Sequence, residues 1–293
     1  MQESCLIEAP ACSRQGVPAI RDDPRWPSPD VAIRQEPFPR RDPKRQTWNG
    51  AGCESHSQFG DGRDSVGGKD RAMDEDQFFE KRNFQTQRGG VLPAARLAYR
   101  TLGTLNSART NAVLVPSWYS GTSHDTEMFM VGAGRALDPD KYFMILTDLL
   151  GSGTSSSPSN TPAPHERGRF PHVTIHDNVR LQHALITERL GLDRLRLVAG
   201  WSMGAAQTFE WACQFPDMVQ AACPIAGSAR TANYNKVFLL ALRRALELDP
   251  DFRQGFYDRP PVAGLRAFAT IYAGWGTSEP FFRQAAWQAL GSR

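Results

Sequence analysis

LRLVAGWSMGAAQTFEWACQ, residues 195–214, is the stretch of sequence that decides the fold. Its first six residues are mostly apolar, which is typical of a short strand buried in a sheet. From Met203 onward, apolar side chains recur at helical spacing, and Pro216 ends that run. Ser202 therefore lies at a sharp turn between a strand and a helix.

Gly200, Ser202 and Gly204 form a G-x-S-x-G pattern in this turn. A serine in a tight strand-to-helix turn projects its hydroxyl from the carboxyl edge of the sheet, where it can act as a nucleophile. The two glycines have no side chains, so the strand and the helix can approach closely. The amide of Met203, at the positive end of the helix, would then face the oxyanion that develops during acyl transfer.

Strands and helices alternate on both sides of this turn. Further strands are expected in residues 92–103, which alternate loosely like an exposed strand, and in residues 111–121, 141–153 and 219–227. Helices are expected in residues 174–191, 203–216 and 234–250, and residues 276–293 look like the start of another. This alternation predicts an α/β fold of roughly six strands, with a mostly parallel sheet and helices on both faces.

Residues 1–72 differ in composition from the rest of the chain. They hold eight of the 21 prolines but only seven valines, isoleucines and leucines. A segment so poor in large aliphatic residues cannot bury enough surface to offset the entropy of ordering it. We predict that residues 1–72 are a disordered tail, or else sequence upstream of a true start at Met73, and that residues 73–293 form a folded α/β domain.

Composition also limits the classes of partner and the cellular compartment that we expect. The net charge is +3, from 34 basic and 31 acidic residues, and basic residues do not cluster with aromatic ones, which argues against nucleic acid as a partner. The five cysteines contain no CxxC pair, so a structural metal site is not expected and a reducing compartment is favoured. No apolar run reaches the roughly 18 residues that span a membrane. We expect a soluble, cytoplasmic protein without membrane contact.

Longer motifs around the turn resemble the homoserine O-acetyltransferase family of α/β-hydrolase-fold acyltransferases. They are LAYRTLGTLNSARTNAVLVPSWYSGTSH (residues 97–124), LLGSGTSSSPSNTP (residues 149–162), the run over residues 170–219, and GSARTANYNKVFLLAL (residues 227–242). The resemblance covers about residues 80–285, with the motifs in the same order. It implies an α/β-hydrolase fold whose helical cap begins at about residue 231.

The resemblance also implies roles for particular residues. Ser202 would be the acylated serine, the backbone amides of Met203 and Tyr119 would form the oxyanion hole, and Gly200 and Gly204 would be the elbow glycines. The serine would take an acyl group from an acyl-CoA or a simple ester and pass it to a small alcohol or to water, while a histidine moves the proton. No metal or bound cofactor is implied, acyl-CoA would be a co-substrate, and a homodimer remains open.

The sequence departs from the family pattern around the expected acceptor site. Members that use homoserine have a His-Ala-Leu-Thr-Gly type of loop where this chain has SWYSG, residues 117–121. They also hold the substrate carboxylate with an arginine, which should fall near Ala273 and Gly274 in this chain. Trp201 replaces the glycine that is usual beside the nucleophile. These departures argue against homoserine as the acceptor.

The acid and the histidine of a catalytic triad are not found after Ser202. No histidine follows it, and each aspartate that follows is explained by a turn or a polar loop: Asp217, Asp249, Asp251 and Asp258. His124, in the loop expected near the oxyanion hole, is the one candidate for a substitute base, whereas Asp148 reads as a turn residue. The resemblance implies several tens of further residues that carry the missing groups. The alternative to an enzyme is an inactive hydrolase-fold protein with at most a binding role.

Overall fold

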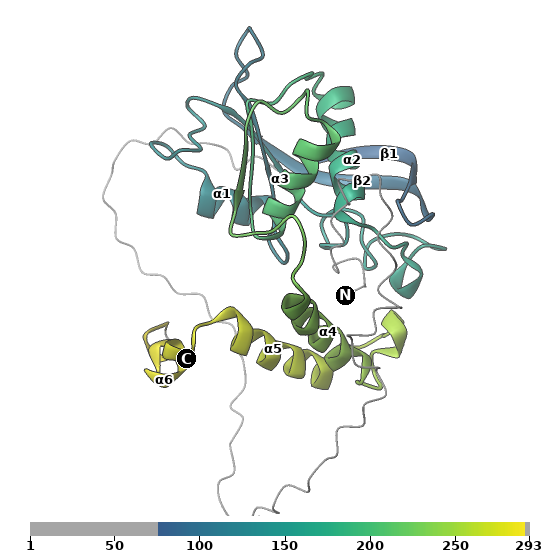
Figure 1. The fold of residues 1–293 in the computed structure, drawn as a ribbon. Coiled ribbons are helices and arrows are strands. Elements are labelled where there is room, and N and C mark those ends of the chain that lie inside the picture. The colour runs from purple at the N-terminus through teal and green to yellow at the C-terminus, as the bar shows by residue number, and fades with distance from the viewer. Residues whose placement is uncertain (1–75, 291–293) are drawn as a thin grey trace, which may run out of the picture. The chain divides into compact units, whose positions relative to one another are not determined.

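The computed structural model describes residues 76–290, and the disordered tail predicted for residues 1–72 lies outside them. Six strands form one sheet in the order β1-β2-β4-β3-β5-β6 (Figure 1). The strands are β1 Gln77–Gln85, β2 Val91–Leu102, β3 Ala112–Pro116, β4 Phe143–Thr147, β5 Leu197–Trp201 and β6 Ala222–Ile225. β4, β3, β5 and β6, which are neighbours in this order, run parallel to one another. β2 pairs antiparallel with β4, and β1 pairs antiparallel with β2. The predicted α/β architecture with a mostly parallel sheet is confirmed.

The helices follow the strands in the order that the sequence predicts. They are α1 Ser123–Met130, α2 Ile175–Ala184, α3 Met203–Gln214, α4 Asn233–Glu247, α5 Val262–Gly276 and α6 Glu279–Arg283. Short 3-10 helices occupy Arg167–Arg169, Arg253–Gly255 and Ala286–Leu290, and a π-helical turn over Leu185–Arg189 continues α2. Gly191, with φ +62°, lies just after that turn, as the prediction of a helix stop requires.

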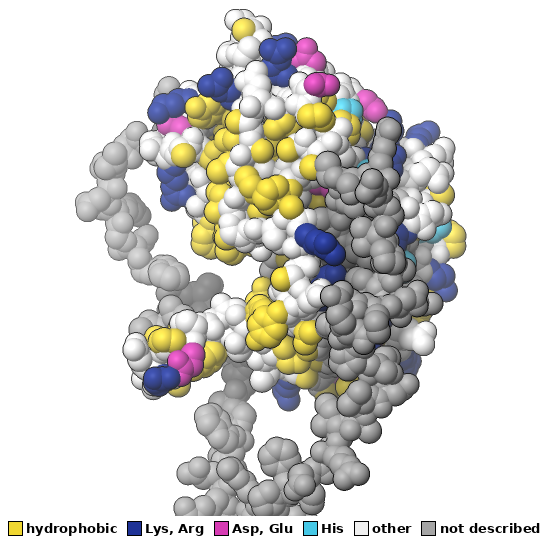
Figure 2. Space-filling view, viewed as in Figure 1, with side chains coloured by type: hydrophobic (Ala, Val, Ile, Leu, Met, Phe, Trp, Pro, Cys, Tyr) yellow, Lys and Arg dark blue, Asp and Glu magenta, His cyan; other side chains and the backbone are white. Residues whose placement is uncertain are grey.

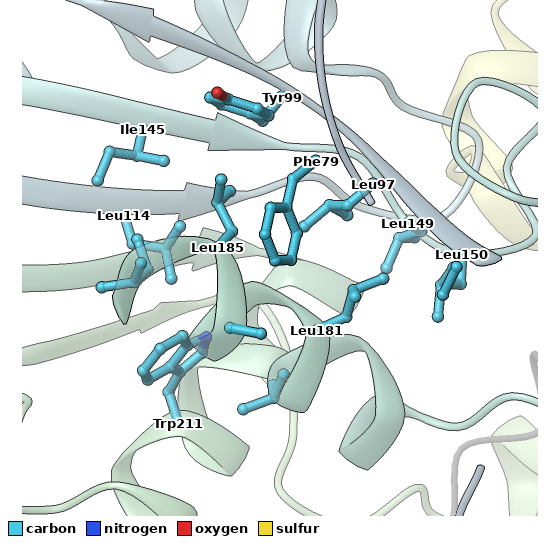
Figure 3. Packing of buried hydrophobic residues seen from close by; sticks show 14 of the residues in the cluster. Phe79, Leu97, Tyr99, Leu114, Ile145, Leu149, Leu150, Leu181, Leu185 and Trp211 are labelled. Atoms are coloured by element: carbon cyan, nitrogen blue, oxygen red, sulfur yellow. The ribbon is translucent and has the colours of Figure 1, made fainter. Parts of the chain in front are cut away.

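The core lies on both faces of the sheet because side chains alternate along each strand. Leu114, Ile145 and Val198 join α2 and α3 in the larger cluster, which also holds Leu185 and the fully buried Trp211 (Figure 3). Their neighbours along β3, β4 and β5 form the second cluster on the opposite face: Val113, Val115, Met144, Leu146 and Ala199. This two-sided burial fixes the carboxyl ends of the central strands, where the turn at Ser202 lies.

The edge of the sheet that holds β1 and β2 differs from the prediction. The sequence does not single out β1, because its many charged and polar residues (QFFEKRNFQ) resemble a loop. Residues 92–103 were expected to form an exposed strand, but Leu97, Ala98, Tyr99 and Arg100 are all buried. The reason is that β2 is paired on both sides, with β1 and with β4.

α5 is a second element that the sequence does not predict. Its 15 residues include three glycines, which disfavour a helix. Packing on α4 compensates for this composition, since Phe238 stacks on Trp275 with ring centroids 4.7 Å apart. Gly264 lets the two helices approach, because a Cβ there would lie only 2.9 Å from the carbonyl oxygen of Ala245.

Apolar side chains remain exposed on these two helices (Figure 2). They include Tyr234, Val237 and Leu240 on α4 and Leu265, Tyr272 and Trp275 on α5. Within residues 76–290, no helix combines the length and the apolar character that crossing a bilayer requires.

Asp177 ties the start of α2 to the hairpin between β1 and β2. Its carboxylate accepts hydrogen bonds from the amide of Thr174, at 2.9 Å, and from the amide of Gln87, at 2.7 Å. We expect Asp177→Ala to lower the free energy of unfolding by about 2 kcal/mol, since it removes the capping box of α2 and the hydrogen bond that ties the amide of Gln87 to this helix. The matched control is Asp125→Ala, which removes the same capping box from α1 without the second contact and should cost about 1 kcal/mol. Urea unfolding measures both, and equal losses would contradict the role of the Gln87 contact.

Candidate active site

Ser202 occupies the turn between β5 and α3, as the sequence predicts. Its backbone has φ 55° and ψ −115°, a combination that residues with a side chain rarely adopt. A hydrogen bond from the amide of Ser202 to the carbonyl of Ile225, at 2.9 Å, holds this geometry against β6. The side chain is half-buried, so the hydroxyl remains accessible at the end of the sheet.

The two elbow glycines lie where a side chain cannot fit. A Cβ on Gly200 would be 2.2 Å from the carbonyl oxygen of Gly204, and a Cβ on Gly204 would be 2.5 Å from the carbonyl oxygen of Pro116. A third glycine, Gly227, is just as restricted, because its Cβ would be 2.5 Å from the carbonyl oxygen of Ser202. The sequence analysis missed Gly227, and the only signal for it was its place directly after a strand.

Strained backbone gathers at the carboxyl ends of three neighbouring strands. Ser120 follows β3 with φ 65°, Ser202 follows β5 with φ 55°, and Ala226 follows β6 with φ 50°. Each of these residues carries a side chain and still adopts the left-handed region. Such outliers persist only where the surrounding structure holds them, and they occur preferentially at functional sites.

Two amides were predicted to bind the oxyanion. Met203 is the first residue of α3, where helix geometry leaves its N–H without a partner inside the helix and where the positive end of the helix dipole lies. Tyr119 is half-buried in a turn that the amide of Gly121 closes by donating to the carbonyl of Trp118, at 3.0 Å. Both residues lie on segments that leave the carboxyl ends of adjacent parallel strands, β5 and β3. The roles of these amides stay a prediction.

A row of aromatic side chains begins at Trp201, the residue before Ser202 in the chain. Trp201 contacts Trp118 edge to face, with ring centroids 5.1 Å apart, and Trp118 contacts Phe129 at 6.0 Å. Trp201 is 43% exposed and Phe129 is 66% exposed. An exposed row of aromatic rings therefore begins next to the serine in the chain.

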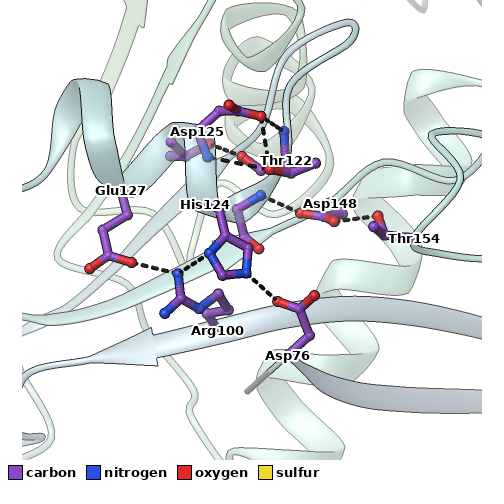
Figure 4. A network of polar contacts seen from close by, with 10 residues as sticks. Asp76, Arg100, Thr122, His124, Asp125, Glu127, Asp148 and Thr154 are labelled. Atoms are coloured by element: carbon purple, nitrogen blue, oxygen red, sulfur yellow. Dashed lines mark hydrogen bonds and ion pairs between the residues drawn. The ribbon is translucent and has the colours of Figure 1, made fainter. Parts of the chain in front are cut away.

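His124 is held in a polar network (Figure 4). It lies in the first turn of α1, whereas the sequence analysis expected it in a loop. The guanidinium of Arg100 donates to Nδ1 of His124 at 2.9 Å, so Nε2 must carry the proton, and Asp76 lies 3.2 Å from Nε2. Both ring nitrogens are thus engaged, and the structure gives His124 no contact with Ser202.

The hydroxyl of Ser202 makes no hydrogen bond within residues 76–290. The two histidines of α2, His176 and His183, contact other side chains rather than Ser202. His176 lies 3.0 Å from the carboxylate of Glu210, and His183 stacks on Phe215 with ring centroids 3.9 Å apart. Burial lowers the pKa of His183, which favours its neutral form.

Two aspartates that follow Ser202, Asp217 and Asp249, lie in turns or loops, as predicted. Asp217 is exposed. Asp249 is buried and accepts hydrogen bonds from the amides of Gly264, at 2.7 Å, and Asp251, at 2.9 Å, and these bonds lower the pKa of its carboxyl. Among the described residues, no group of three or more histidines, cysteines, aspartates and glutamates could hold a metal ion.

Asp148 is buried at the end of β4. It accepts hydrogen bonds from the amide of Ser123, at 2.5 Å, and from the hydroxyl of Thr154 (Figure 4). These bonds give Asp148 a structural role, but not the expected turn: the bond from Ser123 ties the end of β4 to the start of α1. Burial raises the pKa of this carboxyl, although the hydrogen bonds partly oppose the shift.

This shift predicts a pH dependence of stability. The native carboxyl keeps its proton to a higher pH than the same group in the unfolded chain, where the pKa is about 3.9. The free energy of unfolding should therefore fall as the pH rises from about 4 through the native pKa of Asp148, and stay level above it. In Asp148→Asn the side chain can still accept from the amide of Ser123 but cannot ionise, so this variant should not show the fall in stability.

Urea unfolding across this pH range checks the prediction. The stability of Asp148→Asn relative to the wild type should rise with pH and then level off. The exposed Asp217→Asn is the matched control. A difference between Asp148→Asn and the wild type that is independent of pH would contradict the expectation.

Comparisons with known proteins agree with this architecture. A family model described as alpha/beta hydrolase fold matches residues 113–289. An ethyl acetate hydrolase from Pseudomonas veronii is 44% identical over 207 residues, which are 70% of this chain and 59% of that protein. A homoserine O-acetyltransferase from Trichormus variabilis is 41% identical over 191 residues, which are 62% of this chain and 53% of that protein.

Among solved structures, the acetyl esterase MekB superposes with a TM-score of 0.72 at 40% identity, over 75% of this chain and 64% of that one. The homoserine O-acetyltransferase from Bacillus anthracis gives a TM-score of 0.66 at 25% identity, over 72% of this chain and 62% of that one. The chain spans about three fifths of the length of the curated relatives that it matches first, 59% and 60%.

Proposed function

Because the chain belongs to the alpha/beta hydrolase fold family, we propose that Ser202 is the nucleophile of an acyl-transfer site that hydrolyses small acetate esters. The observation that carries this proposal is the backbone of Ser202, held at φ 55° between two glycines that no larger residue could replace. A structural serine has no need of this strained geometry, whereas a nucleophile must project its hydroxyl from the sheet.

The proposed reaction has two steps. In the first, Oγ of Ser202 attacks the ester carbonyl carbon, and the bond from that carbon to the alcohol oxygen breaks. The proton of the serine passes to a general base and from there to the departing alcohol. The amides of Met203 and Tyr119 stabilise the oxyanion. In the second step, water loses a proton to the base and attacks the acyl carbon, the bond from that carbon to Oγ breaks, and Oγ regains the proton from the base as acetate leaves.

Similarity to esterases favours water as the acceptor. The relatives named as an ethyl acetate hydrolase and a probable esterase are 44% and 42% identical to this chain. The apolar surface of Trp118, Trp201 and Phe129 suits a neutral alkyl ester, and it offers no charge to a carboxylate. Residues 273 and 274, where the resemblance places a carboxylate-binding arginine, are an alanine and a glycine on α5.

Transfer to an alcohol is the second candidate, because several relatives are homoserine O-acetyltransferases, at 34–41% identity. Acyl-CoA would then be the donor. Both reactions share the acyl-serine step, so the first experiment addresses that step and a later one the acceptor. Acyl-CoA as co-substrate, the homodimer and the cytoplasmic location stay predictions.

The general base is the part of the site that the described residues do not bring to the serine. No histidine follows Ser202 in the sequence, and the ring of His124 is engaged with Arg100 and Asp76. Imidazole added to the solution can take the place of a missing histidine. It therefore separates the presence of a nucleophile from the presence of a base.

The experiment incubates the 293-residue protein with p-nitrophenyl acetate, with and without imidazole. Intact mass and peptide mapping then locate the acetyl group. We expect one acetyl group on Ser202, formed faster with imidazole than without it. Equal rates in the two conditions would show that the chain supplies its own base. No acetyl group on Ser202 in either condition would overturn the proposal and leave the non-catalytic alternative.

Adding ethanol or homoserine to the acetylated protein then tests the acceptor. Free acetate as the main product supports hydrolysis. Conversion of either alcohol to its acetate ester at the expense of free acetate supports transfer.

A further inference from the structure

A chain of buried hydrogen bonds starts at Trp211 on α3, passes through Gln182 on α2 and Gln207 on α3, and ends at the residue that follows β3. The indole N–H of Trp211 donates to Oε1 of Gln182 at 2.8 Å, and Nε2 of Gln182 donates to Oε1 of Gln207 at 2.6 Å. Nε2 of Gln207 then donates to the carbonyl oxygen of Ser117 at 2.9 Å. All four residues have no exposed surface.

The polarity of this chain is fixed at one end. An indole N–H can only donate, so Gln182 must turn its oxygen toward Trp211 and its amino group toward Gln207. Gln207 must in turn offer its oxygen to Gln182, which leaves its amino group facing Ser117. The backbone carbonyl there can only accept, so each group has its proper partner and no alternative arrangement satisfies them all.

The last member of the chain holds the entry to the loop that carries Tyr119. The amide of Ser117 donates to the carbonyl of Thr147 at 2.9 Å, and its carbonyl accepts from Gln207. The hydroxyl of Ser117 is buried without a partner among the described residues, so the main-chain bonds alone anchor it. Because a peptide unit is planar, fixing the carbonyl of Ser117 also fixes the direction in which the chain continues into the loop.

The nucleophile and this loop are therefore joined through one helix. Gln207 lies one turn beyond Met203 on α3, whose first residues follow Ser202 directly. Gly204 allows the approach, since a Cβ there would lie 2.5 Å from the carbonyl oxygen of Pro116 and 3.3 Å from that of Ser117. α3 thus presents one oxyanion amide at its start and positions the segment that bears the other.

We propose that Gln207 is a positioning residue, which acts through Ser117 to set the distance between the oxyanion amides of Met203 and Tyr119. The proposal rests on the proposed acyl-transfer function, but the geometry that it concerns can be measured without any reaction. Gln207 itself is fully buried, which leaves it no surface for a contact with substrate.

The test compares Gln207→Leu with Gln214→Leu in the full chain. Gln214 is a glutamine on the same helix whose amide donates to Glu210 at 2.6 Å, and it has no contact with the loop. Hydrogen exchange of the amides of residues 117–121 should become faster in Gln207→Leu and remain at the wild-type rate in Gln214→Leu. Unchanged exchange in Gln207→Leu, or equal acceleration in both variants, would overturn the proposal.

Acetylation of Ser202 by p-nitrophenyl acetate, with imidazole present, gives the second readout. Displacement of an oxyanion amide by about 1 Å can cost about 100-fold in rate, so Gln207→Leu should acetylate 10- to 100-fold more slowly, roughly, at an unchanged half-saturating ester concentration. If the wild type is not acetylated, the proposed function fails, while the exchange experiment still decides the role of Gln207. If the wild type is acetylated and Gln207→Leu reacts equally fast, the function stands and the positioning role fails.

Gln207→Glu adds a pH signature that a general loss of stability does not produce. An ionised carboxylate can accept from Gln182 but repels the carbonyl oxygen of Ser117, whereas a protonated one can donate to it. The acetylation rate of Gln207→Glu relative to the wild type should therefore recover as the pH is lowered, and that of Gln207→Leu should not. A parallel pH profile for the two variants would argue against the hydrogen bond to Ser117 as the cause.

Discussion

Ser202→Ala is expected to lower the imidazole-assisted rate of p-nitrophenol release from p-nitrophenyl acetate to less than about a tenth of the wild-type rate, and to leave the fold intact. The loss follows from the removal of the atom that forms the covalent bond to the acetyl group. The hydroxyl makes no hydrogen bond within residues 76–290, so its removal should cost little stability. Steady-state rates, with the imidazole-only rate subtracted, measure the effect.

The matched control is Ser278→Ala. Ser278 is exposed at the start of α6 and makes no capping hydrogen bond with its side chain. It should keep the wild-type rate. If Ser202→Ala keeps more than about a tenth of the wild-type rate, a group other than Ser202 carries the reaction.

Gly200→Ala is expected to give the largest loss of stability, about 3 kcal/mol or more. The added Cβ would lie 2.2 Å from the carbonyl oxygen and 2.3 Å from the carbonyl carbon of Gly204. Both are backbone atoms of α3, so no side chain can rotate away to make room. β5 and α3 would have to separate, and the turn at Ser202 would open with them. Urea unfolding and the rate of Ser202 acetylation should therefore fall together.

Gly274→Ala is the matched control for this glycine. Nothing lies within 4 Å of a Cβ at Gly274, which is on the exposed side of α5. The same substitution there should raise the free energy of unfolding by about 0.5–1 kcal/mol, because alanine restricts the unfolded chain and favours a helix. If both variants lose the same stability, steric exclusion at Gly200 is not the cause.

The central part of the fold could be read from the sequence because local patterns agree with the tertiary structure there. β3, β4, β5 and β6 coincide with apolar runs, and α3 begins and ends within one or two residues of the turn and proline signals. β1 and α5 could not be read in this way. β1 is a strand through its pairing with β2, and α5 is a helix through its aromatic contacts with α4, so neither depends on its own propensity.

The same distinction, between local patterns and contacts of distant segments, applies to the candidate site. The sequence indicated the serine turn and its two glycines because a five-residue motif encodes a local backbone requirement. Gly227 and Gln207 had no such signal, since each is needed only for a contact with a segment distant in the sequence, at Ser202 and Ser117. His124 was a candidate base by its position in the chain, and the partners of its ring show that it serves a polar network instead.

The sequence by itself therefore determined the family, the mostly parallel sheet and the turn that presents Ser202. These follow from short-range rules: side-chain periodicity, helix termination and the conformational freedom of glycine. Only the tertiary structure decided which buried polar groups face one another, because hydrogen bonds between distant segments depend on how helices dock on the sheet. The amide chain from Trp211 to Ser117 is such a case: the order of its donors and acceptors is settled by packing that no local pattern records.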